Sequence, residues 1–223
     1  MRGAVRTVAP VRLMRWKEIG AGLCIMAFPL MLLFGFVTHP NIFSLEMVTD
    51  YDAWAAEWRS SSMFHVGHLF VMMAVPLIIV ACIRLMAMLD GPRAWYGFFG
   101  GILGVFGAFM LAVDKGALTF VLTAFRTLPE AEFQASTPAI QAIFERGGWL
   151  WLTWGFVTLP VGFIVLAVGL IRHGAVPKWQ GICMIFGLLL LLNPDIEIIS
   201  SAGALLMCLG FIPLGVRIAM SRP

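Results

Sequence analysis

Residues 61–83 read SSMFHVGHLFVMMAVPLIIVACI and decide the class of fold. From Met63 to Ile83 this stretch has no Asp, Glu, Lys or Arg. It is also as long as a helix that crosses a hydrocarbon core, for which about 20 apolar residues are needed. His65 and His68 lie near its start. The stretch therefore predicts a membrane-spanning helix with polar side chains close to one end.

The composition of the whole chain agrees with a lipid environment. Of 223 residues, 61% are hydrophobic and only 12% are charged, whereas about 25% are charged in an ordinary soluble domain. Such a chain cannot bury its apolar side chains in one water-soluble core, so we expect the lipid bilayer around it. The net charge is +3 and there is no basic tract, so nucleic acid is not expected as a partner.

Apolar segments of similar length recur along the chain and predict a single six-helix transmembrane domain over residues 1–223. The expected helices are 18–38, 62–84, 94–114 with an alternative end at 126, 149–171, 177–193 and 195–217. Asn193 and Pro194 indicate the turn between the last two, because proline is tolerated in the first turn of a helix. No segment alternates with the period of two that strands show, so the class is all-α.

The charges predict the orientation of these helices. If the N-terminus is inside, eleven of the fifteen basic residues fall on the inner side and ten of the twelve acidic residues on the outer side. Inner loops of membrane proteins carry an excess of Lys and Arg. We therefore expect a multi-pass protein of the plasma membrane, taken as a bacterial inner membrane, with both termini cytoplasmic.

The two long loops fall on the outer side, and each is expected to contain a short interfacial helix. In the loop 40–60, helical spacing places four side chains on one face: Tyr51, Trp54, Ala55 and Trp58. In the loop 127–147, Thr137 and Pro138 are expected to begin a helix that Gly147 ends. Both helices either cover the outer ends of the membrane helices as a lid or rest on lipid headgroups.

The helix expected over 94–114 is rich in glycine, and its glycines suggest that it packs closely against other helices. They are Gly97, Gly100, Gly101, Gly104 and Gly107. Small residues at such spacing let backbones approach each other when lipid removes the hydrophobic drive for association. We expect this helix to be central, and the alternative is an interface between two copies of the chain.

Asp114 and Lys115 are two charged residues within the same apolar segment. Adjacent residues on a helix point about 100° apart, so we expect their partners on other helices or in water rather than in each other. If the helix ends near 114, the pair lies at the outer edge of the hydrocarbon. If the helix crosses over 104–125, the pair lies at mid-membrane, where charge indicates function.

The expected topology brings several polar side chains to one depth near the outer side. They are His39, His65, His68, Asp114, Lys115, Asp195 and Glu197. We interpret them as a polar cluster beneath the outer loops, because water and carboxylates satisfy histidines at such a boundary. A metal site is the alternative, with His65, His68, Met72 and His39 as candidates, since imidazole and thioether are ligands of copper and haem iron.

No enzyme motif is present, which bears on the class of function. The sequence lacks Walker, dinucleotide-binding, nucleophile-elbow, HExxH and CxxC patterns. We therefore expect no catalytic residue and no cofactor. The leading hypothesis is an accessory, assembly or small-molecule-binding membrane protein whose acidic outer face meets a protein partner. The sequence does not indicate an oligomeric state.

Two other classes of function remain open. One is a small proton-coupled transporter that uses Asp114, Lys115 and helices interrupted by proline. The other is a membrane redox or metal protein that holds haem b or copper at His65, His68 and Met72.

Overall fold

The chain folds into helices throughout the part that the structure describes. The computed structural model describes residues 9–40, 42–43, 45, 51–142, 148–193 and 196–221, and no strand occurs within these ranges. In chain order the elements are α1 (Ala9–Val37), α2 (Tyr51–Ser60), α3 (Ser62–Met86), the 3-10 turn η1 (Gly91–Arg93), α4 (Ala94–Arg126), α5 (Glu130–Ala142), α6 (Gly148–His173), α7 (Lys178–Leu190) and α8 (Glu197–Met220). The all-α class predicted from the sequence is confirmed.

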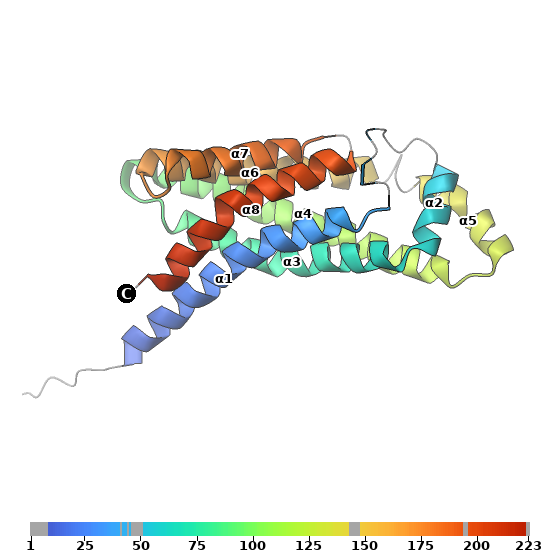
Figure 1. Cartoon of the computed structure of the whole chain (residues 1–223), viewed down its shortest axis with the longest axis horizontal. Helices are drawn as coiled ribbons and strands as arrows, with labels where there is room; N and C mark the ends of the chain where they lie inside the picture. Colours follow the sequence, from blue (N-terminus) through green and yellow to red (C-terminus); the bar gives the residue numbers. More distant parts are fainter. Residues whose placement is uncertain are drawn as a thin grey trace, which may run out of the picture.

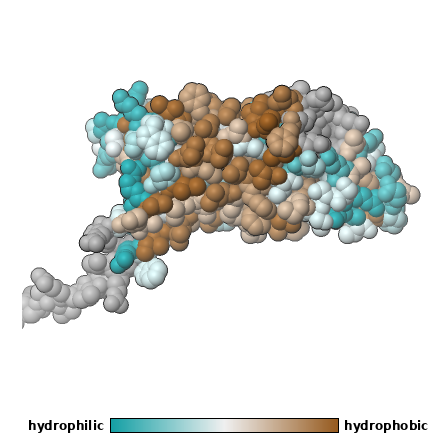
Figure 2. Space-filling view, viewed as in Figure 1, coloured by the Kyte–Doolittle hydropathy of each residue, from teal (hydrophilic) through white to brown (hydrophobic). Residues whose placement is uncertain are grey.

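Several helices are suited to a membrane. Among the described residues, four segments are long and apolar enough to cross one: Arg15–Val37, Ser62–Met86, Gly91–Arg126 and Glu197–Met220. α6 and α7 contribute shorter apolar segments, Val157–His173 and Lys178–Leu190. A broad hydrophobic band lies between two hydrophilic ends of the molecule (Figure 2). These features are compatible with membrane insertion, and the number of six spans stays a prediction.

The long helices pack side by side (Figure 1), and the contacts between neighbours close them into a ring of six. α1 packs against α3, α3 against α4, α4 against α6, α6 against α7, α7 against α8, and α8 returns to α1. Inside this ring Phe28, Phe163 and Phe211 from three different helices meet, with ring centroids 4.9 to 5.9 Å apart. Each of the three is at most 2% exposed, so aromatic side chains fill the interior at this level.

Glycines permit the close contacts of the ring. A Cβ atom added at Gly162 of α6 would lie 2.7 Å from the carbonyl oxygen of Gly100 in α4, and one added at Gly100 would lie 2.8 Å from that of Gly162. Gly22 and Gly215 make the same kind of reciprocal approach between α1 and α8. All five glycines expected to serve packing in α4 are buried, facing α3 or α6: Gly97, Gly100, Gly101, Gly104 and Gly107.

α2 and α5 lie beyond one end of the ring, and we refer to them together as the lid (Figure 1). With the start of α3 they enclose a second, smaller apolar core of Ala55, Trp58, Phe64, Phe133 and Ile140. Ala55 and Trp58, which the sequence places on the apolar face of α2, are each 2% exposed. The start of α1, the end of α8 and η1 share the opposite end, which we call the terminal end (Figure 1).

The helix predicted in the second long loop was placed wrongly. It was expected to begin at Thr137 and Pro138, but α5 runs from Glu130 to Ala142 with Pro138 inside it. Proline cannot donate to the carbonyl four residues earlier. In α5 the Thr137 hydroxyl donates to that carbonyl, of Gln134, at 2.9 Å, so the helix continues. Gly147 lies outside the described residues.

Four other helices lie close to the prediction: α3, α6, α7 and α8 begin and end within three residues of the expected ranges. α1 begins at Ala9, well before the expected residue 18, because good helix formers such as Arg, Leu, Met and Lys predominate in the segment before its apolar part. α4 takes the longer alternative and ends at Arg126, which makes it about 50 Å long.

Arg59 fastens the two helices of the lid to each other. Its guanidinium donates to the Glu130 carboxylate and to the Leu128 carbonyl, both at 2.8 Å. It also lies over the Phe133 ring, 4.5 Å from the centroid. Because the Glu130 side chain is 70% exposed, the ion pair itself contributes little. The contact with the Phe133 ring and the hydrogen bond to the Leu128 carbonyl therefore contribute most of the stability that Arg59 gives to the lid.

We therefore expect Arg59→Ala to loosen the lid while the ring stays folded. Amide hydrogen exchange in α2 and α5 should become faster by about tenfold, which corresponds to a local loss of about 1.4 kcal/mol. Exchange in α4 and α6 should not change. Glu130→Gln is the matched control and should have a much smaller effect. Equal exchange in both variants would show that the carbonyl and ring contacts of Arg59 do not hold the lid.

Candidate functional site beneath the lid

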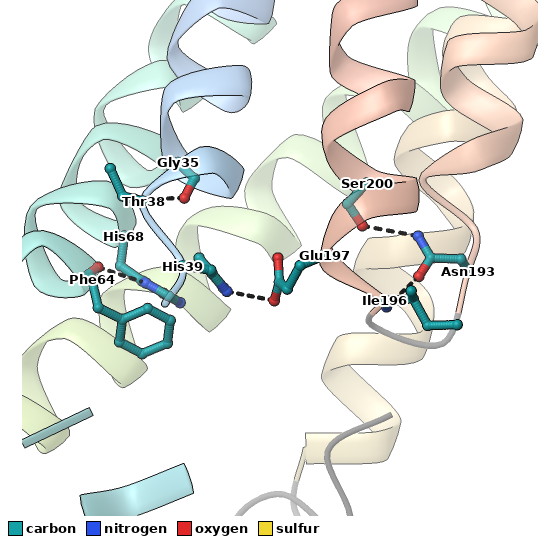
Figure 3. A network of polar contacts seen from close by, with 9 residues as sticks. All are labelled: Gly35, Thr38, His39, Phe64, His68, Asn193, Ile196, Glu197 and Ser200. Carbon is teal, nitrogen blue, oxygen red and sulfur yellow. Dashed lines mark hydrogen bonds and ion pairs between the residues drawn. The ribbon is translucent and has the colours of Figure 1, made fainter. Parts of the chain in front are cut away.

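His39 and Glu197 connect α1 to α8 at the lid end of the ring. His39 lies in the turn after α1, and Glu197 is the first residue of α8. The Nδ1 atom of His39 is paired with the Glu197 carboxylate (Figure 3). The two side chains are only 17% and 15% exposed. Because a carboxylate accepts hydrogen bonds, His39 Nδ1 carries the hydrogen, and the N-terminus of α8 favours the negative charge on Glu197.

His68 of α3 lies next to His39 and is buried. The two imidazoles are stacked, with centroids 5.2 Å apart and planes inclined by 20°. His68 Nδ1 is 3.0 Å from the Phe64 carbonyl oxygen (Figure 3). A carbonyl can only accept, so Nδ1 carries a hydrogen and Nε2 of the neutral ring is an acceptor. Lys115 and His39 both act on His68 electrostatically.

His65 has a different surrounding, since it faces the lid. Its ring makes a hydrogen bond to the backbone carbonyl of Trp58 and packs on the Trp58 ring at 4.1 Å. Trp58 belongs to the last turn of α2, whose carbonyls have no partner within the helix. One nitrogen of His65 thus caps α2, while its Nε2 is buried and makes no hydrogen bond to any residue that the structure describes.

A close crossing of α1 and α3 places these histidines together. A Cβ atom at Gly67 would lie 3.0 Å from the carbonyl oxygen of Gly35, so the backbones nearly touch. Thr38 donates to that same oxygen at 2.7 Å (Figure 3). His39 follows this crossing on one chain segment and His68 follows it on the other. Gly35 and Gly67 were not predicted to matter for the site, although small residues in both helices are the feature of the sequence that indicates such a crossing.

Asp114 and Lys115 pair with each other, contrary to the expectation from the sequence. Lys115 Nζ lies 3.2 Å from Asp114 Oδ2, and the Asp114 side chain is 9% exposed. The Cβ atoms of the two residues point about 100° apart, but the long and flexible lysine side chain can fold back to its neighbour. The pair lies within α4, about 30 Å along the axis from Ala94.

Asn193 connects the end of α7 to the start of α8 through hydrogen bonds. Its side-chain amide donates to the Leu190 carbonyl at 2.7 Å and to the Ser200 hydroxyl at 2.9 Å. Its Oδ1 accepts from the backbone N–H of Ile196 (Figure 3). The side chain therefore joins the end of α7 to the start of α8. Pro194 and Asp195, which were also singled out in the sequence, lie outside the described residues.

The structure brings together most of the polar side chains predicted to form one group. We use the name polar cluster for His39, His65, His68, Asp114, Lys115 and Glu197. They come from the turn after α1 and from α3, α4 and α8. Trp58 and Phe64, which cover the cluster, were not predicted as site residues. Their rings lie edge to face against each other and against His68.

The geometry does not assemble a metal centre in the part of the chain that is described. No group of three or more His, Cys, Asp or Glu side chains there is placed to hold a metal ion. His65 and His68 each direct one nitrogen at a backbone carbonyl. Met72, the third candidate ligand, is half-buried on α3. Haem b or copper at these residues stays a prediction without support from the site.

No protein-family model matches the chain, and neither a curated protein nor a solved structure does so. The polar cluster and its surroundings are therefore the basis for proposing a function.

Proposed function

We propose that the protein is a multi-pass membrane protein that binds a small polar molecule in the polar cluster beneath the lid. One observation carries this proposal: titratable side chains from four elements converge at one end of an otherwise apolar ring, and two extra helices cover them. Apolar residues at these positions would give a helix bundle of equal stability, because burying ion pairs is costly. Stability alone therefore does not explain the polar side chains.

Orientation forms part of the same proposal. The lid is the outer end and the terminal end is cytoplasmic, in a plasma membrane that six helices cross. The positive-inside distribution of Lys and Arg supports this. Asp52, Glu130 and Glu132 are exposed on the lid, so a protein partner that docks there would meet an acidic surface.

Labelling of single cysteines in whole cells tests the orientation. A membrane-impermeant thiol reagent should modify Ala135→Cys on α5 and should fail to modify Ser221→Cys at the end of α8. Both positions are exposed, so only the side of the membrane decides the outcome. Lysed cells, in which both positions must react, are the control. Modification of Ser221→Cys alone in intact cells would reverse the orientation.

Access to the cluster tests the binding site itself. Ser201 lies one turn after Glu197 on α8, and its hydroxyl is buried and makes no hydrogen bond to a described residue. In a chain whose four native cysteines are replaced, Ser201→Cys should react with 2-aminoethyl methanethiosulfonate more slowly than Ala135→Cys, and faster once Arg59→Ala loosens the lid. Ala204→Cys, at a position with no exposure, should stay unmodified. If Ser201→Cys never reacts, with or without Arg59, no small molecule reaches the cluster.

A proton-coupled transporter is the second candidate, and one observation favours it. The three phenylalanines that fill the ring each lie within three residues of a proline inside the same helix, namely Pro29, Pro160 and Pro213. Such prolines free a backbone carbonyl and allow a helix to bend. An apolar constriction also keeps a path closed by excluding water.

Proton flux into liposomes that contain the purified protein tests this candidate. Phe163→Ser should let water into the constriction and raise the flux several-fold, whereas Phe163→Leu should keep it closed. Phe98→Ser, at a position that is 57% exposed on the outside of α4, controls for damage to the membrane. Equal flux in all three variants would remove the transporter hypothesis.

A further inference from the structure

Hydrogen-bond acceptors prevail in the polar cluster. His65 and His68 each donate through one nitrogen to a backbone carbonyl, so the Nε2 atom of each neutral ring offers a lone pair. The carboxylates of Asp114 and Glu197 can only accept. His65 Nε2 is buried without a hydrogen bond to any described residue. A molecule that donates several hydrogen bonds matches this set of groups.

The charges of the cluster point to the same class of molecule. The polar cluster contains two carboxylates, those of Asp114 and Glu197, and one ammonium, that of Lys115. If its histidines are neutral, one negative charge has no counterion among the described members of the cluster. A single additional cation balances the site.

Aromatic rings enclose the cluster from the side of the lid. Trp58 and Phe64 are only 2% and 3% exposed, and their ring centroids are 5.6 Å apart. Phe64 also contacts the His39 ring at 4.5 Å. Aromatic faces attract cations, most strongly when water is excluded. Asp114 Oδ2 is buried, lies 3.2 Å from Lys115 Nζ and accepts no hydrogen bond from a residue that the structure describes, so it can accept one from a bound amine.

We infer that the ligand is a small protonated amine, which binds beside Glu197. This inference rests on the proposed function, since it names the class of molecule that the polar cluster takes. Acceptor atoms, a missing positive charge and aromatic walls all support an amine over an anion or a neutral molecule. The exposed acids of the lid raise the local concentration of cations near the site.

Calorimetry on the purified full chain in detergent tests the inference, with ethylammonium as the probe. We expect saturable binding of ethylammonium at about one molecule per chain. Tetramethylammonium has no N–H to donate and should bind more weakly.

Variants and other probes identify the site and separate the two proposals. Glu197→Gln should weaken ethylammonium binding by about tenfold or more, because the counterion is lost, whereas Glu132→Gln on the exposed face of α5 should not. Binding of ethylammonium and of tetramethylammonium is compared on the unmodified protein, so the test holds even if Glu197→Gln fails to fold. If no amine binds, the inference is overturned. Binding of acetate that depends on Lys115 would overturn the amine while leaving a small-molecule site, and an unreactive Ser201→Cys would overturn the site itself.

Discussion

Gly162→Ala is expected to separate α4 from α6 and to lower the free energy of unfolding by about 2–3 kcal/mol, the usual cost of forcing extra atoms into a packed contact. The added Cβ would lie 2.7 Å from both the carbonyl oxygen of Gly100 and the Cα atom of Gly104. Both are backbone atoms, which cannot rotate out of the way as a side chain can. The helices must therefore move apart along their whole contact.

Unfolding in mixed detergent, followed by circular dichroism, measures this effect. Gly20→Ala is the matched control, because a Cβ atom there meets nothing within 4 Å. Alanine at that position should leave stability unchanged or raise it by up to about 1 kcal/mol through its helix propensity. If the two variants are equally stable, close backbone approach does not determine how α4 and α6 pack.

Lys115→Ala is expected to have the second large effect. It removes the ammonium that neutralises Asp114, whose side chain is 9% exposed. A carboxylate left alone in such a place costs about 3 kcal/mol unless it takes up a proton. Replacing both residues by alanine should then cost less than the single change, since no uncompensated charge remains.

A double-mutant cycle over Asp114 and Lys115 gives the coupling between them. The same unfolding assay serves, and the coupling should exceed about 1 kcal/mol, more than solvated surface pairs reach. Asp114→Asn with Lys115 intact completes the comparison. Negligible effects of all the variants would mean that water, rather than the partner, satisfies both groups.

Much of the fold follows from local features of the sequence. Long apolar runs fix where α3, α6, α7 and α8 begin and end, because hydropathy is a property of each segment alone. The start of α5 was missed for a reason that is equally local. A proline usually marks a helix start, and only the geometry of the helix shows that the Thr137 hydroxyl replaces the missing donor.

The members of the polar cluster were named from the sequence, but the contacts between them were not predicted. Topology alone placed His39, His68 and Glu197 at one depth. Which of them touch depends on the crossing of α1 and α3 at Gly35 and Gly67, and such crossings arise from packing of whole helices. The pairing of Lys115 with Asp114 was excluded wrongly, since side-chain flexibility does not appear in a pattern of Cβ directions.

The contact between α1 and α8 sets an order of events during biosynthesis. α1 emerges from the ribosome first among the helices of the ring, and the helix against which it packs emerges last. With more than 150 residues between them, translation at about 5–20 residues per second leaves α1 waiting on the order of ten seconds or longer. During that time its glycine-lined face at Gly22 has no partner within the nascent chain. His39 and Glu197 meet only after α8 has been made, so a ribosome that stalls before α8 yields a chain in which the polar cluster lacks its member from α8.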